Sequence, residues 1–297
     1  MRHLPVTAEE ATRRLRGIAL ICGAMLCFSF LDTAAKYASR HVPVFEVVWA
    51  RYAFSLFFAV VLLRSWARPA EYLTKRPAMQ VVRALFLVVS TGFNFMALRY
   101  LQLAEASAIA FASPLLLTAL AGPILGEWPG PRRWVAVVIG FIGVLIIVRT
   151  DPGGFQPAAL FSLGAALCYA GYGLTTRLLS ATETPAGMLV YGSLFGVIIL
   201  SPALPTLGEM PPDWLIVAAL IATGLFGAVG HYFLILANRE APAIVLAPFQ
   251  YTQILWMPIL GYLVFGDVPG ASTVIGAPVV IASGLYILYR ERVHRDR

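Results

Sequence analysis

Charged residues are scarce in this chain of 297 residues. Asp, Glu, Lys and Arg together make up 12% of it, whereas 59% is hydrophobic and the mean hydropathy is +0.79. Soluble domains average about 25% charged residues. A chain this apolar cannot hide its surface from water, so the composition excludes an ordinary soluble domain and indicates a lipid bilayer as the solvent.

Cysteine and histidine are also rare, with three and four copies. Cys22, Cys27 and Cys168 lie inside apolar runs and form no CxxC pair, so we expect buried thiols, no disulfide and no metal. The chain has no HExxH, GxSxG, P-loop or DDxxD motif, and its histidines are isolated. It lacks the clusters that membrane proteases and prenyl-transfer enzymes need, so we expect neither an enzyme nor a cofactor.

The net charge of +7 raises the question of nucleic-acid binding. The basic residues, however, sit in short loops and tails, and no RNP, zinc-finger or helix-turn-helix pattern accompanies them. Membrane topology explains this distribution better, and we expect no nucleic-acid partner. The basic stretch 13–16 before an apolar run resembles a signal peptide, but nine more apolar runs follow, which favours a first membrane helix.

Apolar segments long enough to cross a bilayer recur along the whole chain. A membrane helix needs about 20 mostly apolar residues. Ten segments approach this length: 17–38, 44–63, 79–98, 104–125, 133–149, 158–178, 186–203, 213–236, 243–265 and 273–289. The connections between them are short, and no soluble domain interrupts them. We therefore predict an all-α membrane protein with ten transmembrane helices.

The positions of Lys and Arg orient these helices, because cytoplasmic loops retain them. With the N-terminus inside, the inner segments carry 16 of the 22 basic residues and the outer loops carry three. The remaining three, Lys36, Arg51 and Arg83, lie within predicted helices. We predict that both termini are cytoplasmic, with tails at 1–16 and 290–297, in a bacterial-type inner membrane.

A short motif recurs at a fixed distance and indicates an internal repeat. GEWPG occupies 126–130 and GDVPG occupies 266–270, an offset of 140 positions. The same offset aligns Ala97 and Arg99 with Ala237 and Arg239. Five helices is an odd number, so a repeated five-helix unit enters the membrane upside down the second time. Inverted repeats are typical of secondary transporters, whose site lies near the midplane between the halves.

These residues resemble the EamA-type members of the drug/metabolite transporter superfamily. The matching features are the ten helices, the helix ends LGE at 125–127 and FGD at 265–267, the two Ala/Arg pairs, and Arg51 followed by Tyr52. Asp267 departs from the usual Glu. The resemblance implies two five-helix units, 17–149 and 158–289, around a central cavity. Members of the superfamily include amino-acid exporters, riboflavin importers and multidrug pumps, so the substrate stays open.

Charged residues inside the first two predicted helices are candidates for substrate binding or coupling. Ser29, Asp32, Thr33 and Lys36 share one face of the first helix by their spacing. A charge within a membrane span is costly and is functional by default, so Asp32 could bind an amine or a proton. Alternatively, Asp32 and Lys36 form a structural ion pair. Arg51 needs a partner, which could be Glu46, Asp32 or a substrate carboxylate.

Further candidates lie in the second half and around a possible cavity. Gln250, Gln253 and Met257 share a face of the ninth predicted helix, where two amides are expensive unless they bond across helices or to a ligand. His231 could relay protons or act as a hydrogen-bonded spacer. Trp49, Asn94, Tyr172 and Trp256 would give room for a flat or apolar solute. We interpret Glu127 and Asp267 as helix-terminating residues.

The leading functional hypothesis is a secondary transporter working by alternating access, which exports amino acids or related compounds. A pairing of Asp32 with Arg51 or Lys36 would suit a zwitterion. The alternatives are a riboflavin-type vitamin importer, a multidrug or organic-cation exporter, and a non-transporting structural membrane subunit. The expected partners are a small-molecule substrate and the lipid bilayer, with proton coupling left open. Two units in one chain supply enough helices for one pathway, which favours a monomer.

Overall fold

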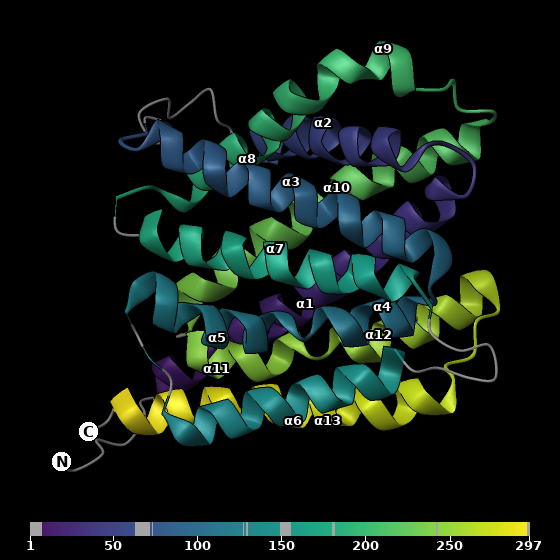
Figure 1. Ribbon diagram of the computed structural model, residues 1–297. Coiled ribbons are helices and arrows are strands. Elements are labelled where there is room, and N and C mark those ends of the chain that lie inside the picture. The colour runs from purple at the N-terminus through teal and green to yellow at the C-terminus, as the bar shows by residue number, and fades with distance from the viewer. Residues whose placement is uncertain are drawn as a thin grey trace.

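The fold is a bundle of helices that lie side by side (Figure 1). The computed structural model describes residues 8–62, 72, 74–126, 128, 130–148, 156–179, 182–241 and 243–295. Every regular element within these ranges is a helix, as the sequence predicts. Eight helical segments of the described chain are long and apolar enough to cross a membrane, two of which, Leu103–Leu120 and Pro185–Leu207, join adjacent helices. Ala271–Ile287 is a shorter apolar helix. The count of ten spans stays a prediction.

The first half of the chain forms α1 (Ala8–Ser39), α2 (Val44–Leu62), α3 (Pro77–Tyr100), α4 (Leu103–Ala110), α5 (Ser113–Leu125) and α6 (Pro131–Val148). The second half forms α7 (Ala158–Leu179), α8 (Pro185–Leu200), η3 (Ser201–Ala203), α9 (Leu204–Leu207), α10 (Trp214–Glu240), α11 (Ala243–Gln250), α12 (Gln253–Leu260), η4 (Gly261–Phe265) and α13 (Ala271–Arg295). Helix α1 begins nine residues before the predicted first span, so much of the predicted N-terminal tail is helical.

Local sequence explains where several helices begin. Proline opens α3, α6 and α8, where its missing N–H costs nothing. The side chain of Asp213 accepts hydrogen bonds from the backbone N–H groups of Leu215 and Ile216 and so caps the start of α10. On α6, Val135, Val138, Ile142 and Leu145 form an exposed apolar stripe at helical spacing. An exposed apolar stripe of this kind suits contact with the apolar lipid tails of a membrane.

The helix ends repeat at the offset of 140 positions that the sequence indicates. Helix α1 ends at Ser39 and α7 at Leu179, whereas α3 ends at Tyr100 and α10 at Glu240. Helices α4 and α11 both begin and end at positions that are 140 residues apart. Gly126 and Gly266, which follow the matched ends at 125 and 265, have φ angles of 72° and 71°. Only glycine adopts this left-handed conformation without strain, which explains its place in both turns.

Two of the ten predicted spans, 104–125 and 243–265, are each divided into two helices in the structure. The breaks fall at Phe111–Ala112 and at Tyr251–Thr252, again 140 positions apart. Pro114 offers no N–H to residue 110, which interrupts the first helix. At the second break the hydroxyl of Thr252 donates to the carbonyl of Phe249 at 2.7 Å, and three-residue turns replace the α-helical ladder.

The two halves of the chain interleave. Helix α1 packs along α10, and α3 packs along α7, so each pair combines one helix from each half. Helices α6 and α13 pack together at one edge of the bundle (Figure 1). The start of α1 and the end of α13 lie at the same end of the bundle in this view. This arrangement fits termini on one side of the membrane, although the side itself stays a prediction.

Candidate functional site

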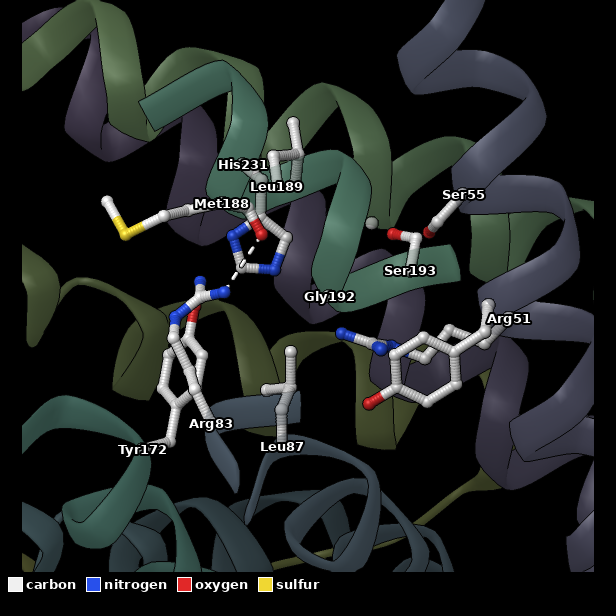
Figure 2. Close-up of a pocket in the computed structure, with 12 residues that line it drawn as sticks. Arg51, Ser55, Arg83, Leu87, Tyr172, Met188, Leu189, Gly192, Ser193 and His231 are labelled. Carbon is white, nitrogen blue, oxygen red and sulfur yellow. Dashed lines mark hydrogen bonds between the residues drawn. The ribbon is translucent and has the colours of Figure 1, made fainter. Parts of the chain in front are cut away.

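A small cavity lies between α2, α3, α7, α8 and α10 (Figure 2). Its lining combines two arginines with aromatic, hydroxyl, small and apolar side chains: Arg51, Tyr52, Ser55, Arg83, Leu87, Tyr172, Met188, Leu189, Gly192, Ser193, Gly227 and His231. Binding sites for small molecules have this character, with a mostly apolar wall and a few placed polar groups. The helices of both halves contribute to it.

Arg83 of α3 is held firmly in the wall of this cavity. Its Nε–H group donates a hydrogen bond to Thr176 Oγ1. Its two terminal nitrogens donate to the carbonyl of Met188 and to the hydroxyl of Tyr172, and all three distances are 2.8 Å. The guanidinium also lies 4.7 Å from the centre of the Tyr172 ring. The residue is 3% exposed. Three neutral partners therefore fix the direction of this positive charge.

Arg51 of α2 is the second buried cation, and it has fewer partners. Its guanidinium lies 4.5 Å from the centre of the Tyr52 ring, and Tyr52 is anchored by a 2.9 Å hydrogen bond between its hydroxyl and Thr91. Among the described residues, no carboxylate lies within 4.0 Å of either Arg51 or Arg83. Figure 2 shows the two guanidinium groups approaching the cavity from α2 and α3. The cavity wall is thus positively charged.

Glu46 is not the partner of Arg51, which excludes one of the predicted pairings. Its carboxylate accepts the backbone N–H of Glu209 at 2.9 Å and so ties α2 to the segment before α10. Glu46 lies five positions before Arg51, which places the two side chains about 140° apart around the helix. The face of α2 that carries Arg51 therefore turns towards the cavity, and the face that carries Glu46 turns away.

Asp32 is the centre of a second polar cluster. Its carboxylate accepts Nδ2 of Asn94 at 3.1 Å and Nε2 of Gln253 at 3.4 Å. The three residues come from α1, α3 and α12, so the structure brings together candidates that are 62 and 221 positions apart. Arg51 is the basic residue whose charge acts on Asp32. Arg51 lines the cavity, whereas Asp32, Asn94 and Gln253 are not among its lining residues.

The hypothesis that Asp32 pairs with Lys36 is wrong. Lys36 lies one helical turn farther along α1, and its Nζ lies 2.6 Å from Oδ2 of Asp267. Asp267 therefore does more than terminate a helix. Its counterpart in the repeat, Glu127, lies outside the described residues. The long side chain of Lys36 reaches towards the helix end, where a fixed carboxylate from the other half is nearer than Asp32.

The remaining candidates fall in different places. Tyr172 and His231 line the cavity, and the His231 ring packs edge-on against Phe28 with 5.0 Å between ring centres. Trp49 donates Nε1 to Ser201 Oγ at 3.0 Å and so joins α2 to η3. The indole nitrogen of Trp256 is buried without a hydrogen-bond partner among the described residues.

Gln250 does not share a face with Gln253 and Met257, because the helix breaks between the two glutamines. Gln250 is exposed, Gln253 reaches Asp32, and Met257 is buried. The three cysteines are free, but each is half-buried rather than fully buried. Within the described chain, no group of three or more His, Cys, Asp or Glu could hold a metal ion.

Arg83 is the site residue that the sequence interpretation missed. It lies inside the apolar run 79–98, which is the same signal that singled out Arg51. A buried arginine in a membrane span faces the interior of the bundle by default. If this rule is applied to every arginine within an apolar run, it identifies both Arg51 and Arg83 from the sequence.

Known proteins are similar to this chain over most of its length. The model of the EamA-like transporter family matches residues 15–149 and 156–289. An S-adenosylmethionine uptake transporter from Rickettsia prowazekii is 28% identical, over 94% of each chain. A riboflavin transporter from Vibrio cholerae is 29% identical, over 92% of this chain and 93% of its own. A pseudopaline exporter from Pseudomonas aeruginosa is 26% identical, over 90% and 94%.

A solved crystal structure is also similar, with a TM-score of 0.63 and 17% sequence identity. The alignment covers 95% of this chain and 99% of the other. At this identity the likeness shows a shared fold and does not extend to the substrate.

Proposed function

Because the chain belongs to the EamA-like transporter family and is a multi-pass membrane transporter, we propose that it carries a small zwitterionic metabolite, with a carboxylate and an amino group. The observation that carries this proposal is Arg51, a buried guanidinium at the cavity wall with no carboxylate within 4.0 Å among the described residues. Two charges of opposite sign, Arg51 and Asp32, then provide the two poles that a zwitterion needs.

The carboxylate of the substrate would bind between Arg51 and Arg83. A buried charge without a counterion is costly, so an anion that neutralises the cavity wall is stabilised there. A guanidinium has five N–H donors, and Arg83 uses three of them in the hydrogen bonds to Thr176, Met188 and Tyr172. The remaining donors of Arg83 and the planar fork of Arg51 suit a carboxylate.

The amino group of the substrate would bind at Asp32. A carboxylate offers about four lone-pair positions, and Asn94 and Gln253 occupy two of them. The two amides also fix the orientation of the carboxylate, which lowers the cost of ordering it on binding. The sequence therefore supplies both a cation and an anion from the first two helices, and the amides from α3 and α12 hold the anion in place.

The relatives support a substrate of this class without deciding it. S-adenosylmethionine carries an α-amino group and an α-carboxylate, whereas riboflavin carries neither. Riboflavin is the second candidate, favoured by the riboflavin transporter among the relatives and by the rings of Tyr52 and Tyr172 in the cavity lining. Export stays a prediction from the sequence, because the relatives include both uptake transporters and an exporter.

We also propose that the membrane topology is the inverted one that the repeat predicts. The broken pairs α4–α5 and α11–α12 would each cross the membrane as one interrupted span. The other eight spans would be α1, α2, α3, α6, α7, α8, α10 and α13. Ten spans place both termini on one side of the membrane. Irregular backbone at membrane depth is tolerated where it is buried in protein or lines a cavity.

The test is transport by the purified full-length protein in liposomes, in both directions and with or without a pH gradient. The labelled panel contains S-adenosylmethionine, neutral and aromatic amino acids, threonine, riboflavin and a flat organic cation. We expect saturable transport of a zwitterion that is lost in Arg51→Gln. Arg99→Gln, which removes an exposed arginine on α3, is the matched control and should transport normally.

Each other outcome assigns a different function. Riboflavin transport without any zwitterion signal would replace the proposal by the second candidate. Transport of the organic cation alone would point to a multidrug-type exporter and contradict a positively charged binding site. Dependence on the pH gradient would indicate proton coupling. Substitution of Asp32 and of His231 would then show which of the two residues is responsible.

A further inference from the structure

Lys36 and Asp267 form a partly buried ion pair that joins the two halves of the transporter. Nζ of Lys36 lies 2.6 Å from Oδ2 of Asp267 and also donates to the carbonyl of Leu101 at 2.9 Å. The side chains are 3% and 22% exposed. Lys36 and Leu101 belong to the first half, at the ends of α1 and α3, whereas Asp267 follows η4 in the second half. The contact therefore closes a junction between the units.

An aromatic side chain completes this junction. The ring of Phe265 lies 4.7 Å from Nζ of Lys36 and 4.7 Å from the guanidinium carbon of Arg40. Phe265 is partly buried and packs against the main apolar core. The charge of Glu105 on α4 also acts on Lys36. Four elements thus converge on one ammonium group, and the aromatic ring shields it from water.

Along α3, the ion pair lies at the opposite end from Arg83 of the cavity wall. Arg83 is the seventh residue of α3, whereas Leu101 follows the last residue of the same helix. The 18 residues between them span about 27 Å along a helix axis. The junction at Lys36 thus lies at the end of α3 that is farther from Arg83.

At the position that matches Lys36, the repeat places a residue without a charge, whereas Glu127, the counterpart of Asp267, lies outside the described residues. The offset of 140 places Thr176 at the position of Lys36, and Thr176 accepts the hydrogen bond from Nε of Arg83 at 2.8 Å. The halves therefore have a lysine at one end and a hydroxyl at the other.

We propose that the Lys36–Asp267 ion pair is a gate, which closes the transport path at the end of α3 away from Arg83. In the closed state the two charges are held together with little water. When the halves separate at this end, water reaches both charges and offsets the lost attraction, so the open state stays accessible. This inference goes beyond the choice of substrate, because it depends only on transport between two units.

Access to the cavity from the gate end is the measurement that tests this proposal. Ser193, which lines the cavity, is replaced by Cys as a reporter in a chain whose three native cysteines are replaced by Ala. A membrane-impermeant maleimide is applied separately to each side of sealed vesicles. We expect Lys36→Met and Asp267→Asn to raise labelling from the gate side about tenfold. The double variant Lys36→Asp with Asp267→Lys should return it towards the parent rate.

A matched control removes an ion pair at the opposite end of the bundle. Arg13 and Glu240 join α1 to α10 at 3.5 Å, in an exposed position near the start of α1. Arg13→Met should leave labelling from the gate side unchanged. The proposal is overturned if Lys36→Met and Asp267→Asn, with parent-like elution and melting, label at the parent rate. Should Lys36→Met fail to fold, Asp267→Asn and the charge-swapped pair still decide the result.

This readout needs no substrate, so its failure is distinct from failure of the zwitterion assignment. A crosslink provides the converse measurement. Oxidation of Lys36→Cys with Asp267→Cys should suppress labelling of the reporter from the gate side, and reductant should restore it. Unchanged labelling in a chain shown to be crosslinked would also contradict the gate.

Discussion

The rings of Phe111 and Tyr251 pack against each other, with 4.9 Å between their centres and 31° between their planes. The two residues are 140 positions apart and mark the breaks in the two interrupted helices. The repeat therefore places its irregular segments face to face at the junction of the halves. The hydroxyl of Tyr251 is buried there without a hydrogen-bond partner among the described residues.

This unpaired hydroxyl predicts different outcomes for two identical substitutions. Tyr251→Phe should not lower the melting temperature, because it removes a buried polar group that has no partner. Tyr52→Phe should destabilise the protein by about 1 kcal/mol, because it removes the hydrogen bond to Thr91. Thermal unfolding of both variants in one detergent checks this. A larger loss for Tyr251→Phe would show that its hydroxyl has a partner in the native membrane.

Gly196 of α8 lets Tyr52 approach closely, and this predicts a steric effect. A Cβ atom at residue 196 would lie 2.5 Å from Cγ of Tyr52, whereas a Cβ at Gly92 of α3 would meet nothing within 4 Å. We expect Gly196→Ala to destabilise the protein by about 1–3 kcal/mol and to weaken transport, because Tyr52 supports Arg51. Gly92→Ala is the control and should melt at least as high as the parent. Equal melting temperatures for the two variants would contradict this packing.

The proposed amine pole predicts a change in selectivity. Asp32→Asn keeps the size of the side chain and removes its charge. We expect the variant to lose its preference for an amino acid over the corresponding acid without the amino group, by about tenfold or more, since hydrogen bonds to charged groups contribute about 1.5–3 kcal/mol. The transport rates of the two compounds provide the measurement. If both rates fall equally, Asp32 acts on the fold or on coupling instead.

Glu183, in the connection before α8, predicts a dependence of stability on pH. Its partial burial raises the pKa of its carboxyl, but hydrogen bonds outweigh this and hold the pKa below its ordinary value. They come from the backbone N–H of Lys75 at 2.9 Å and the amide of Gln80 at 3.4 Å. Because the folded pKa is the lower one, the contribution to stability is present above the unfolded pKa of about 4.3 and is lost as pH falls through the folded pKa.

The measurement is the melting temperature of the parent and of Glu183→Gln at neutral and at acidic pH. At neutral pH the parent should have a higher melting temperature than Glu183→Gln. The difference between the two melting temperatures should shrink when the pH falls below 4. Lys75 is exposed and takes part through its backbone, so Lys75→Gln should leave the difference in place. A difference that grows on acidification would contradict the hydrogen bonds around Glu183.

Much of the fold is readable from the sequence because it depends on local features. Apolar runs of about 20 residues indicate helices, and the positions of Pro and Gly mark where they begin and end. The repeated Gly126 and Gly266 fix two turns, and the offset of 140 holds for the helix ends. The prolines at 114, 248 and 258 indicate a bend in these two helices, but the sequence does not distinguish a kink from a complete interruption.

The partners of the charged residues were decided by the tertiary structure. The sequence by itself determined that Asp32, Lys36 and Arg51 lie in membrane helices and need partners. It could not determine that Lys36 meets Asp267, 231 positions away, or that Arg83 shares a cavity with Arg51. Helical periodicity specifies the face on which a side chain lies. Which charge it meets depends on how the two halves interleave, because electrostatic pairing follows distance in space and not distance along the chain.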